Sequence, residues 1–318
     1  MSLGFIFPGQ GSQAVGMLAD IAERYPRIAD TFEEAGDCLS LPLWQLVREG
    51  PEERLNSTEI TQPVLLSASV ALWRVWQDEQ GPQPALLAGH SLGEYSALVC
   101  AEAMSFADGV RLVHERGKLM QKAVPQGEGA MAAIMGLADA QVAECCAAVD
   151  GVVTPANYNA PGQVVVAGAA PAVELAVANC QAAGARRAVM LRVSGPFHCA
   201  LMAPAKAAFS ECLDAVELVM PRVPIVHNVD AAIATDLGAL RDKLLGQLAQ
   251  PVLWMSCVQE MTSNGVSQLV ECGPGKVLAG LVKRIDRSVS VANIESPGAF
   301  DEALADLGRG SAGAKDSD

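Results

Sequence analysis

The feature that most constrains this chain is an apolar run that ends in a Gly-x-Ser-x-Gly pentapeptide at residues 89–93 and continues into a helix-forming stretch. This order is typical of a nucleophile elbow, a sharp strand–turn–helix connection that lifts the hydroxyl of Ser91 out of the packed backbone. Gly89 and Gly93 leave room for the strand and the helix to cross closely. The first amides of the new helix can then face a developing oxyanion. We therefore predict a serine nucleophile on an α/β scaffold.

Short β-like apolar runs alternate with longer amphipathic runs, which is the pattern of an α/β fold with a mostly parallel sheet. Between residues 125 and 193 the order is βαββαβ, which predicts an inserted ferredoxin-like α+β subdomain. The larger domain then comprises residues 1–124 and 194–308, and we expect the polar residues 309–318 to be a disordered tail. Strands are expected at 3–7, 85–88, 164–167, 188–193, 223–229 and 268–271, and helices from about 18, after 91, and at 106–124, 172–183 and 203–216.

Composition limits what this protein can bind. The 318 residues are 51% hydrophobic and carry a formal net charge of −14, so they can bury a sizeable core but do not attract nucleic acid or anionic membranes. The N-terminus lacks a basic leader and a long apolar region, so we expect a cytosolic protein without a membrane span. Cysteines and histidines stand at no metal-ligand or disulfide-framework spacing, and we expect no metal.

A serine nucleophile needs a base, and chains with this elbow place the histidine after the serine. His114 lies within a helical run, and His227 lies in a strand-like run where a packing histidine is the default. His198 follows a strand end and a Gly-Pro turn, the kind of loop that holds catalytic residues. We therefore favour His198 as the base, and we expect His90, the neighbour of Ser91, to point away.

Two further features bear on the chemistry. No acidic residue between Ser91 and His198 stands at an obvious strand-end loop, so a backbone carbonyl is expected to orient the histidine. Arg116 borders the apolar stripe of its helix, and a half-buried guanidinium needs an anion, either in a structural salt bridge or in a bound carboxylate. The Gly-rich turn at 7–13 matches no nucleotide-binding pattern but can offer a backbone amide to an oxyanion.

Several motifs together resemble the malonyl-CoA:acyl-carrier-protein transacylases of fatty acid synthesis, over residues 5–281. The resemblance implies an α/β-hydrolase-like domain that carries a ferredoxin-like insertion. The motifs are Phe-Pro-Gly-Gln-Gly-Ser-Gln at 7–13, Gly-His-Ser-Leu-Gly-Glu-Tyr-Ser-Ala at 89–97, Arg-Gly at 116–117, Asn-Ala-Pro-Gly-Gln at 159–163, Phe-His at 197–198 and Glu-Cys-Gly-Pro-Gly-Lys at 271–276.

The resemblance also implies a role for individual residues. Ser91 would become malonylated, and His198 would activate first the serine and later the carrier-protein thiol. The backbone amides of Gln10 and Leu92 would form the oxyanion hole. Gln247 matches the position whose main-chain carbonyl orients the histidine. The implied mechanism is ping-pong, with the acyl group held on the serine between two thiols.

Substrate and partner follow from the same resemblance. Arg116 would hold the free carboxylate of the malonyl group, so the substrates would be malonyl-CoA and holo acyl carrier protein. No metal or redox cofactor takes part, and we expect a monomer. Acyl carrier proteins are acidic, so a chain of this charge must bind one through local basic sites. We expect these at Arg186, Arg187, Lys283 and Arg284, for which ordinary solvated surface is the alternative.

One departure from the family pattern keeps the pathway open. Some members carry Ser-x-Pro-Ser-His where this chain has Ser-Gly-Pro-Phe-His at 194–198, and the Phe-His pair is also similar to malonyl-selective acyltransferase domains of polyketide synthases. A discrete acyltransferase that loads polyketide carriers is therefore the first alternative. A thioesterase or hydrolase is disfavoured by Arg116 and the missing triad acid, and a non-catalytic acyl-CoA-binding module by the presence of Ser91 and His198.

Overall fold

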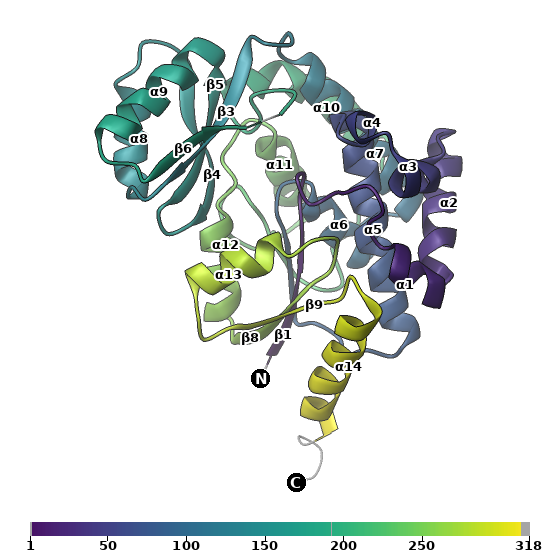
Figure 1. The fold of residues 1–318 in the computed structure, drawn as a ribbon. Coiled ribbons are helices and arrows are strands. Elements are labelled where there is room, and N and C mark those ends of the chain that lie inside the picture. Colours follow the sequence, from purple (N-terminus) through teal and green to yellow (C-terminus); the bar gives the residue numbers. More distant parts are fainter. Residues whose placement is uncertain (1, 192, 313–318) are drawn as a thin grey trace.

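Two β-sheets and their covering helices make up the molecule, which the computed structural model describes over residues 2–191 and 193–312. Sheet A lies at the centre of the larger part (Figure 1) and has the strand order β7-β2-β1-β8-β9, with all neighbours parallel. A parallel sheet between helices is the α/β arrangement that the sequence predicts. Its strands are β1 (Ser2–Phe7), β2 (Leu86–Gly89), β7 (Ile225–Val226), β8 (Val266–Glu271) and β9 (Ser290–Asn293).

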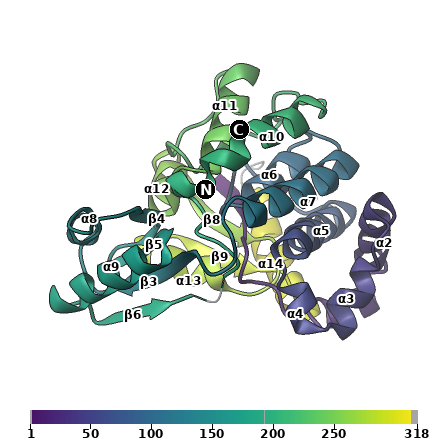
Figure 2. The same ribbon diagram turned by 90° about the horizontal axis from the view of Figure 1, so that it is seen from above.

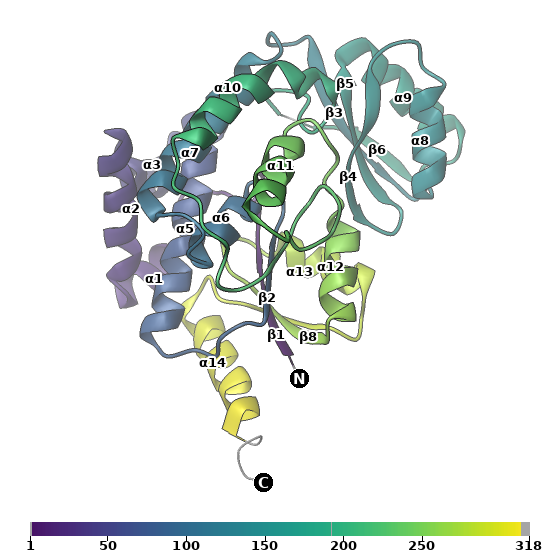
Figure 3. The ribbon, with the colours of Figure 1, turned by 180° about the vertical axis from the view of Figure 1, so that it is seen from behind.

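Helices cover sheet A from both sides. Figures 1 and 3 show α5, α6 and α7 on one side and α12 and α13 on the other. The helices of this part are α1 (Ala19–Arg24), α2 (Arg27–Leu39), α3 (Leu43–Glu49), α4 (Glu52–Leu55), α5 (Thr58–Asp78), α6 (Gly93–Cys100), α7 (Phe106–Lys122), the 3-10 turn η1 (Ala200–Met202), α10 (Ala203–Asp214), α11 (Leu237–Gln247), α12 (Trp254–Ser263), α13 (Val277–Ile285) and α14 (Pro297–Ala312).

The first strand shows why the strands of this sheet are continuous apolar runs in the sequence. Phe5 packs edge-on against Trp73 and Trp76 of α5, with ring centroids 5.2 and 5.4 Å apart. The next residue, Ile6, belongs to the core cluster on the opposite side, which includes Trp254 of α12. A strand that is buried on both faces carries no polar alternation. The carboxyl ends of β1 and β2 lead directly into the turns that carry the candidate site.

Sheet B forms the smaller part and is antiparallel, with the order β4-β5-β3-β6. In chain order its elements read βαββαβ, and this strand order is the ferredoxin-like topology that the sequence predicts. Figure 2 shows it to one side of the larger part, with α8 and α9 packed on its sheet. The elements are β3 (Gly129–Met135), α8 (Asp139–Ala147), β4 (Val153–Ala160), β5 (Gln163–Ala169), α9 (Ala170–Ala182) and β6 (Arg187–Met190).

The structure differs from the sequence prediction between β1 and β2. The pattern predicts only a helix from about residue 18, whereas the segment forms the five helices α1 to α5. Pro26, Pro42 and Pro51 each stand immediately before the start of a new helix, at α2, α3 and α4. Proline lacks the N–H that would continue a preceding helix but is tolerated where the next one starts. The prolines thus divide the segment into short pieces.

Two predicted segments need correction. The strand expected at 223–229 pairs only at Ile225–Val226, because the chain then turns inward and buries His227 and Asn228 beneath the elbow. The disorder expected at 309–318 is wrong for residues 309–312, which continue α14, since extending an existing helix adds one backbone hydrogen bond per residue. Residues 313–318 lie outside the described residues. Within the described chain no helix is both long and apolar enough to span a membrane.

Candidate active site

The elbow has the geometry that its glycines imply. Ser91 adopts φ of 50°, a left-handed conformation that a non-glycine residue rarely takes. A Cβ at Gly89 would lie 1.8 Å from the carbonyl carbon of Gly93, and one at Gly93 would lie 2.0 Å from the carbonyl oxygen of Phe7. Neither position can therefore hold a side chain, and the close crossing presents the Ser91 hydroxyl to a cavity.

The loop after β6 brings His198 to this hydroxyl. The Oγ of Ser91 lies 2.7 Å from Nε2 of His198, and Nδ1 of the same ring lies 2.7 Å from the main-chain oxygen of Gln247 at the end of α11. A carbonyl can only accept, so Nδ1 donates to it and Nε2 is left to accept the proton of Ser91. The sequence-predicted serine, histidine and carbonyl thus lie in one hydrogen-bonded chain.

Burial sets the protonation state of this histidine. Desolvation, followed by the positive charge of Arg116, lowers the pKa of His198 to about 3, while the carbonyl of Gln247 acts in the opposite direction. The imidazole is therefore neutral at neutral pH and free to take a proton.

Arg116 reaches the site from α7 and is buried, with 1% of its surface exposed. Its Nη1 donates to Oε1 of Gln62 at 2.8 Å, and its Nη2 donates to Oε1 of Gln247 at 2.8 Å and to Oγ of Ser91 at 3.3 Å. Its guanidinium lies 5.0 Å from the ring centre of Tyr95. Burial lowers the pKa of this guanidinium. Among the described residues Arg116 has no ion-pair partner and its Nε has no acceptor, so the structural salt bridge is not formed.

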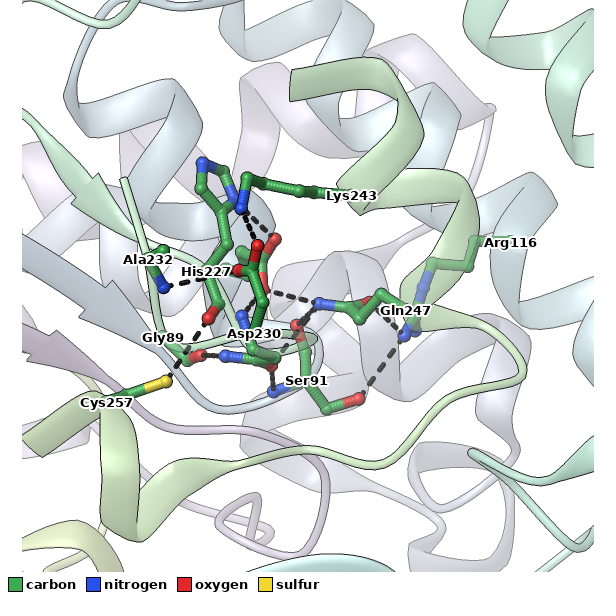
Figure 4. A network of polar contacts seen from close by, with 11 residues as sticks. Gly89, Ser91, Arg116, His227, Asp230, Ala232, Lys243, Gln247 and Cys257 are labelled. Carbon is green, nitrogen blue, oxygen red and sulfur yellow. Dashed lines mark hydrogen bonds and ion pairs between the residues drawn. The ribbon is translucent and has the colours of Figure 1, made fainter. Parts of the chain in front are cut away.

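A buried polar network supports the elbow from below (Figure 4). The side chain of Asn228 accepts the N–H of Ser91 through Oδ1 and donates to the carbonyl of Gly89 through Nδ2, both at 2.7 Å. Its backbone N–H donates to Oε2 of Glu94 at 2.9 Å, and Oε1 of Glu94 lies 2.8 Å from Nδ1 of His227. Asn228 therefore spans the turn that holds Ser91 in its left-handed conformation.

Three site residues are not predicted by the sequence pattern, namely Asn228, Glu94 and Gln62. Asn228 lies two residues after β7 of sheet A, and polar residues at the carboxyl end of a parallel strand are candidates for a site. Glu94 and Gln62 lie in helices whose other residues are mostly apolar, where a buried polar residue calls for a partner. These were the available signals.

Two residues with unpaired backbone amides in the described part of the chain line the same cavity. Gln10 lies in the turn after β1 and Leu92 stands at the start of α6, and both line the cavity. Neither N–H donates a hydrogen bond within the described part of the chain. The side chain of Gln10 is held by a 3.3 Å hydrogen bond from Nε2 to Oγ1 of Thr58. Free amides on two sides of a nucleophile can stabilise an oxyanion.

The cavity above Ser91 has a volume of about 230 Å³ and is lined by both parts of the molecule. Sheet B and the loop after it contribute apolar side chains, among them Met131, Val165 and Leu191. His90 also lines the cavity, and its Nε2 lies 2.8 Å from Oδ1 of Asn159 on β4. This contact joins the elbow to sheet B. No group of side chains in the described residues could hold a metal ion.

The basic residues expected to bind a partner do not form one cluster. Arg284 of α13 donates to Oε1 of Gln163, a residue that lines the cavity. Arg186 covers Gly136, whose N–H bonds to the carbonyl of Gly162 next to Gln163. Both arginines therefore lie beside the β4–β5 turn.

The other two basic residues lie apart from this turn. Arg187 is exposed on β6, paired with Met135. Lys283 is also exposed but lies on the face of α13 that lines a groove toward β9 and α14. The structure thus separates Lys283 from the cavity edge.

Comparison with known proteins agrees with this site. A family model described as "Acyl transferase domain" matches residues 4–304. A protein of Salmonella typhimurium named malonyl CoA-acyl carrier protein transacylase is 54% identical over 302 residues, which cover 94% of this chain and 98% of the relative. The chain belongs to the malonyl CoA-acyl carrier protein transacylase family. It is therefore an acyltransferase, and the alternative of a non-catalytic module is set aside.

Solved structures of this transacylase family share the fold. An acyl carrier protein S-malonyltransferase of Vibrio cholerae is 52% identical with a TM-score of 0.93, covering 95% of this chain and 99% of that one. A malonyl-transacylase in complex with a type II PKS acyl-carrier protein is 50% identical with a TM-score of 0.95, covering 96% and 100%. The predicted fold class is thereby confirmed.

Proposed function

We propose that this protein transfers the malonyl group of malonyl-CoA to the phosphopantetheine thiol of holo acyl carrier protein, through a malonyl ester on Ser91, and so supplies fatty acid synthesis. The observation that carries the proposal is the buried Arg116, which has no carboxylate partner among the described residues and whose Nη2 lies 3.3 Å from Oγ of Ser91. The free carboxylate of a malonyl group is one methylene away from the carbonyl that Ser91 attacks. An arginine at this distance can bind that carboxylate, whereas simple acyl groups have no free carboxylate for it to bind.

The first half-reaction begins with proton transfer. Nε2 of His198 takes the proton from Oγ of Ser91 as the oxygen attacks the thioester carbonyl of malonyl-CoA. The N–H groups of Gln10 and Leu92 stabilise the resulting oxyanion. The tetrahedral adduct then breaks its C–S bond, and the CoA thiolate leaves with the proton from His198.

The second half-reaction uses the same groups in reverse. The thiol of the carrier protein gives its proton to His198, and the thiolate attacks the ester carbonyl. The C–O bond to Ser91 breaks, and the serine oxygen recovers the proton. A carbonyl at Nδ1 stabilises the imidazolium less than a carboxylate would, which suits attack by a thiol better than attack by water. The cycle needs no metal and no redox cofactor.

The carrier protein is expected to bind at the edge of the cavity. Arg186 and Arg284 lie beside the β4–β5 turn and Arg187 is exposed on β6, so an acidic partner would meet basic residues at both places. Lys283 faces a different groove and is the weakest of the four candidates. We propose a cytosolic monomer. The nine cysteines are all free, which supports the reducing compartment.

A discrete acyltransferase that serves polyketide carriers is the second candidate. It is favoured by one observation, the 50% identical relative in complex with a type II PKS acyl-carrier protein. The chemistry on Ser91 would be the same, and only the carrier would differ.

Intact-mass measurement tests the proposed function. We expect malonyl-CoA alone to add one malonyl group per chain, and Ser91→Ala to abolish the adduct. Ser96→Ala, at a buried serine on α6 whose hydroxyl has no hydrogen-bond partner in the described residues, is the control and keeps the adduct. A wild-type protein that stays unmodified would refute the transferase.

Fatty acid and polyketide carriers are then offered side by side to the malonylated protein. Rapid release of free malonate without a carrier would instead indicate a hydrolase.

A further inference from the structure

The side chain of Gln247 makes contacts that the reaction above does not use. Its main-chain oxygen orients His198, but its side-chain amide is buried between two charged groups. Oε1 accepts from Nη2 of Arg116 at 2.8 Å, and Nε2 donates to Oε2 of Glu94 at 2.9 Å. Figure 4 shows the amide between Arg116 and the network beneath Ser91.

We propose that the Gln247 side chain is a positioning residue for acyl-group selection, because it anchors Arg116 and couples it to the buried Glu94 without neutralising it. The inference rests on the proposed function, in which Arg116 binds the malonyl carboxylate. It assigns the side chain and the main chain of one residue to different tasks. The carbonyl serves the base, and the amide serves selection of the acyl group.

The first step of the argument concerns charge. A buried guanidinium that must bind a carboxylate cannot be anchored by a carboxylate, because the anchor would compete with the substrate. The three side-chain acceptors of the Nη atoms of Arg116 are all neutral, namely the amides of Gln62 and Gln247 and the hydroxyl of Ser91. Nε is left without an acceptor. Arg116 is therefore fixed in place but still lacks an anion.

The second step concerns Glu94. Two N–H donors, the backbone of Asn228 and Nε2 of Gln247, point at its Oε2, which accepts both hydrogen bonds. Glu94 and Arg116 form no direct ion pair in the described residues, and the amide of Gln247 joins them through one hydrogen bond on each side. Hydrogen bonds in such a chain polarise one another. Glu94 thus stabilises the charge of Arg116 from a position where it cannot displace the substrate.

A purely structural role is the competing explanation. Nε2 of Gln247 also donates to the carbonyl of Ser91 at 3.0 Å, so the amide could simply support the elbow. The two roles predict different results. Loss of elbow support slows every acyl donor equally, whereas loss of the Arg116 anchor slows only a donor with a free carboxylate.

The test compares malonyl-CoA with acetyl-CoA in Gln247→Met, which keeps the length of the side chain and its carbonyl but removes the amide. We expect kcat/KM for acylation by malonyl-CoA to fall about 10- to 100-fold, mainly through KM, because a charge-assisted hydrogen bond is lost. Acylation by acetyl-CoA should stay within about threefold, since Ser91 and His198 are unchanged. Gln250→Met, at an exposed glutamine three residues on, is the matched control and should match the wild type. An equal fall for both donors, or no change for either, overturns the proposal.

A second variant covers the case in which Gln247→Met does not fold. Gln247→Glu keeps an acceptor for Arg116 but adds a charge that competes with the substrate, so the preference for malonyl-CoA should fall at least as far. An unchanged preference overturns the proposal. A crystal structure without ligand adds an independent readout, because Arg116 should leave its wild-type position in Gln247→Met and keep it in Gln247→Glu. Failure of the wild type to accept malonyl-CoA would instead refute the proposed function, and the position of Arg116 would still test the anchor.

Discussion

The floor and the rim of the cavity are built in opposite ways. Beneath Ser91, the side chains of Glu94, Asn228 and Gln247 are fully buried and hydrogen-bonded to one another. At the rim, strand β6 lies at the edge of sheet B. It exposes Arg187, and Met190 at its other end is 42% exposed. Buried polar groups tolerate few arrangements, whereas exposed side chains tolerate many. We therefore expect the chemistry to depend on the floor and carrier recognition to depend on the rim.

The largest effect should follow from removing charge at the floor. Arg116→Ala should lower transfer from malonyl-CoA by about 100-fold, because a buried charged hydrogen bond to the substrate is lost, and should remove the preference over acetyl-CoA. Transfer assays with both donors measure it. Arg111→Ala, at an exposed arginine on the same helix, is the control. An unchanged malonyl/acetyl ratio would contradict the role of Arg116.

Removing a neutral floor residue should affect both folding and rate. Asn228→Ala leaves the N–H of Ser91 and the carbonyl of Gly89 without their partners, so we expect the free energy of unfolding to fall by about 2–4 kcal/mol. Acylation of Ser91 should slow about tenfold as the turn loosens. Urea unfolding and single-turnover acylation measure the two effects, with Asn264→Ala at an exposed asparagine as control. If unfolding and acylation both match the wild type, Asn228 does not hold the turn.

Charge reversal at the rim should have a smaller and more selective effect. Arg186→Glu and Arg187→Glu should raise KM for an acidic carrier protein several-fold at low salt and less at high salt, because exposed charges are screened. Formation of the malonyl adduct should not change. Arg48→Glu on α3, which Figure 2 places far from sheet B, is the control. A change in adduct formation would show that the rim and the floor are not independent.

The smallest effect expected is that of pH. Because burial lowers the pKa of His198 to about 3, its neutral form is present at all higher pH values and is lost only below that value. The rate of Ser91 acylation should therefore be flat between about pH 5 and 8, as measured by rapid-quench mass analysis. Arg116→Ala should move any acidic limb to higher pH, since the charge of Arg116 contributes to the shift. If the rate of Ser91 acylation falls instead near the ordinary pKa of histidine, then His198 is more accessible to water than the structure indicates.

The sequence predicts the parts of the molecule that depend on local patterns. The elbow, β1 and the βαββαβ order of sheet B follow from periodicity and turn residues, and the structure has all three. The sequence also predicts Ser91 and His198 as site residues, because each follows a strand in a loop or turn. The oxygen that orients His198 was assigned to Gln247 only through family resemblance, since any residue carries a carbonyl.

The rest of the site depends on long-range contacts that no local pattern reveals. Glu94 lies on a short helix where its burial is decided by the neighbours of α6, and Asn228 is 137 residues away from the serine whose N–H it accepts. The strand predicted at 223–229 was too long for the same reason, because the tertiary network draws its last residues out of the sheet. Burial of polar residues is a property of the packed molecule.

The main-chain oxygen that serves His198 has a consequence for genetics. Every amino acid brings the same carbonyl to position 247, so a saturation mutagenesis screen there reports on the side chain alone. Tolerance of a substitution in such a screen would therefore carry no information about the acceptor. Chemical synthesis can reach it, because an ester in place of the peptide bond between Gln247 and Leu248 weakens that oxygen as an acceptor. Point mutation therefore cannot remove the oxygen that holds the base in place, whereas a change in the backbone can weaken it.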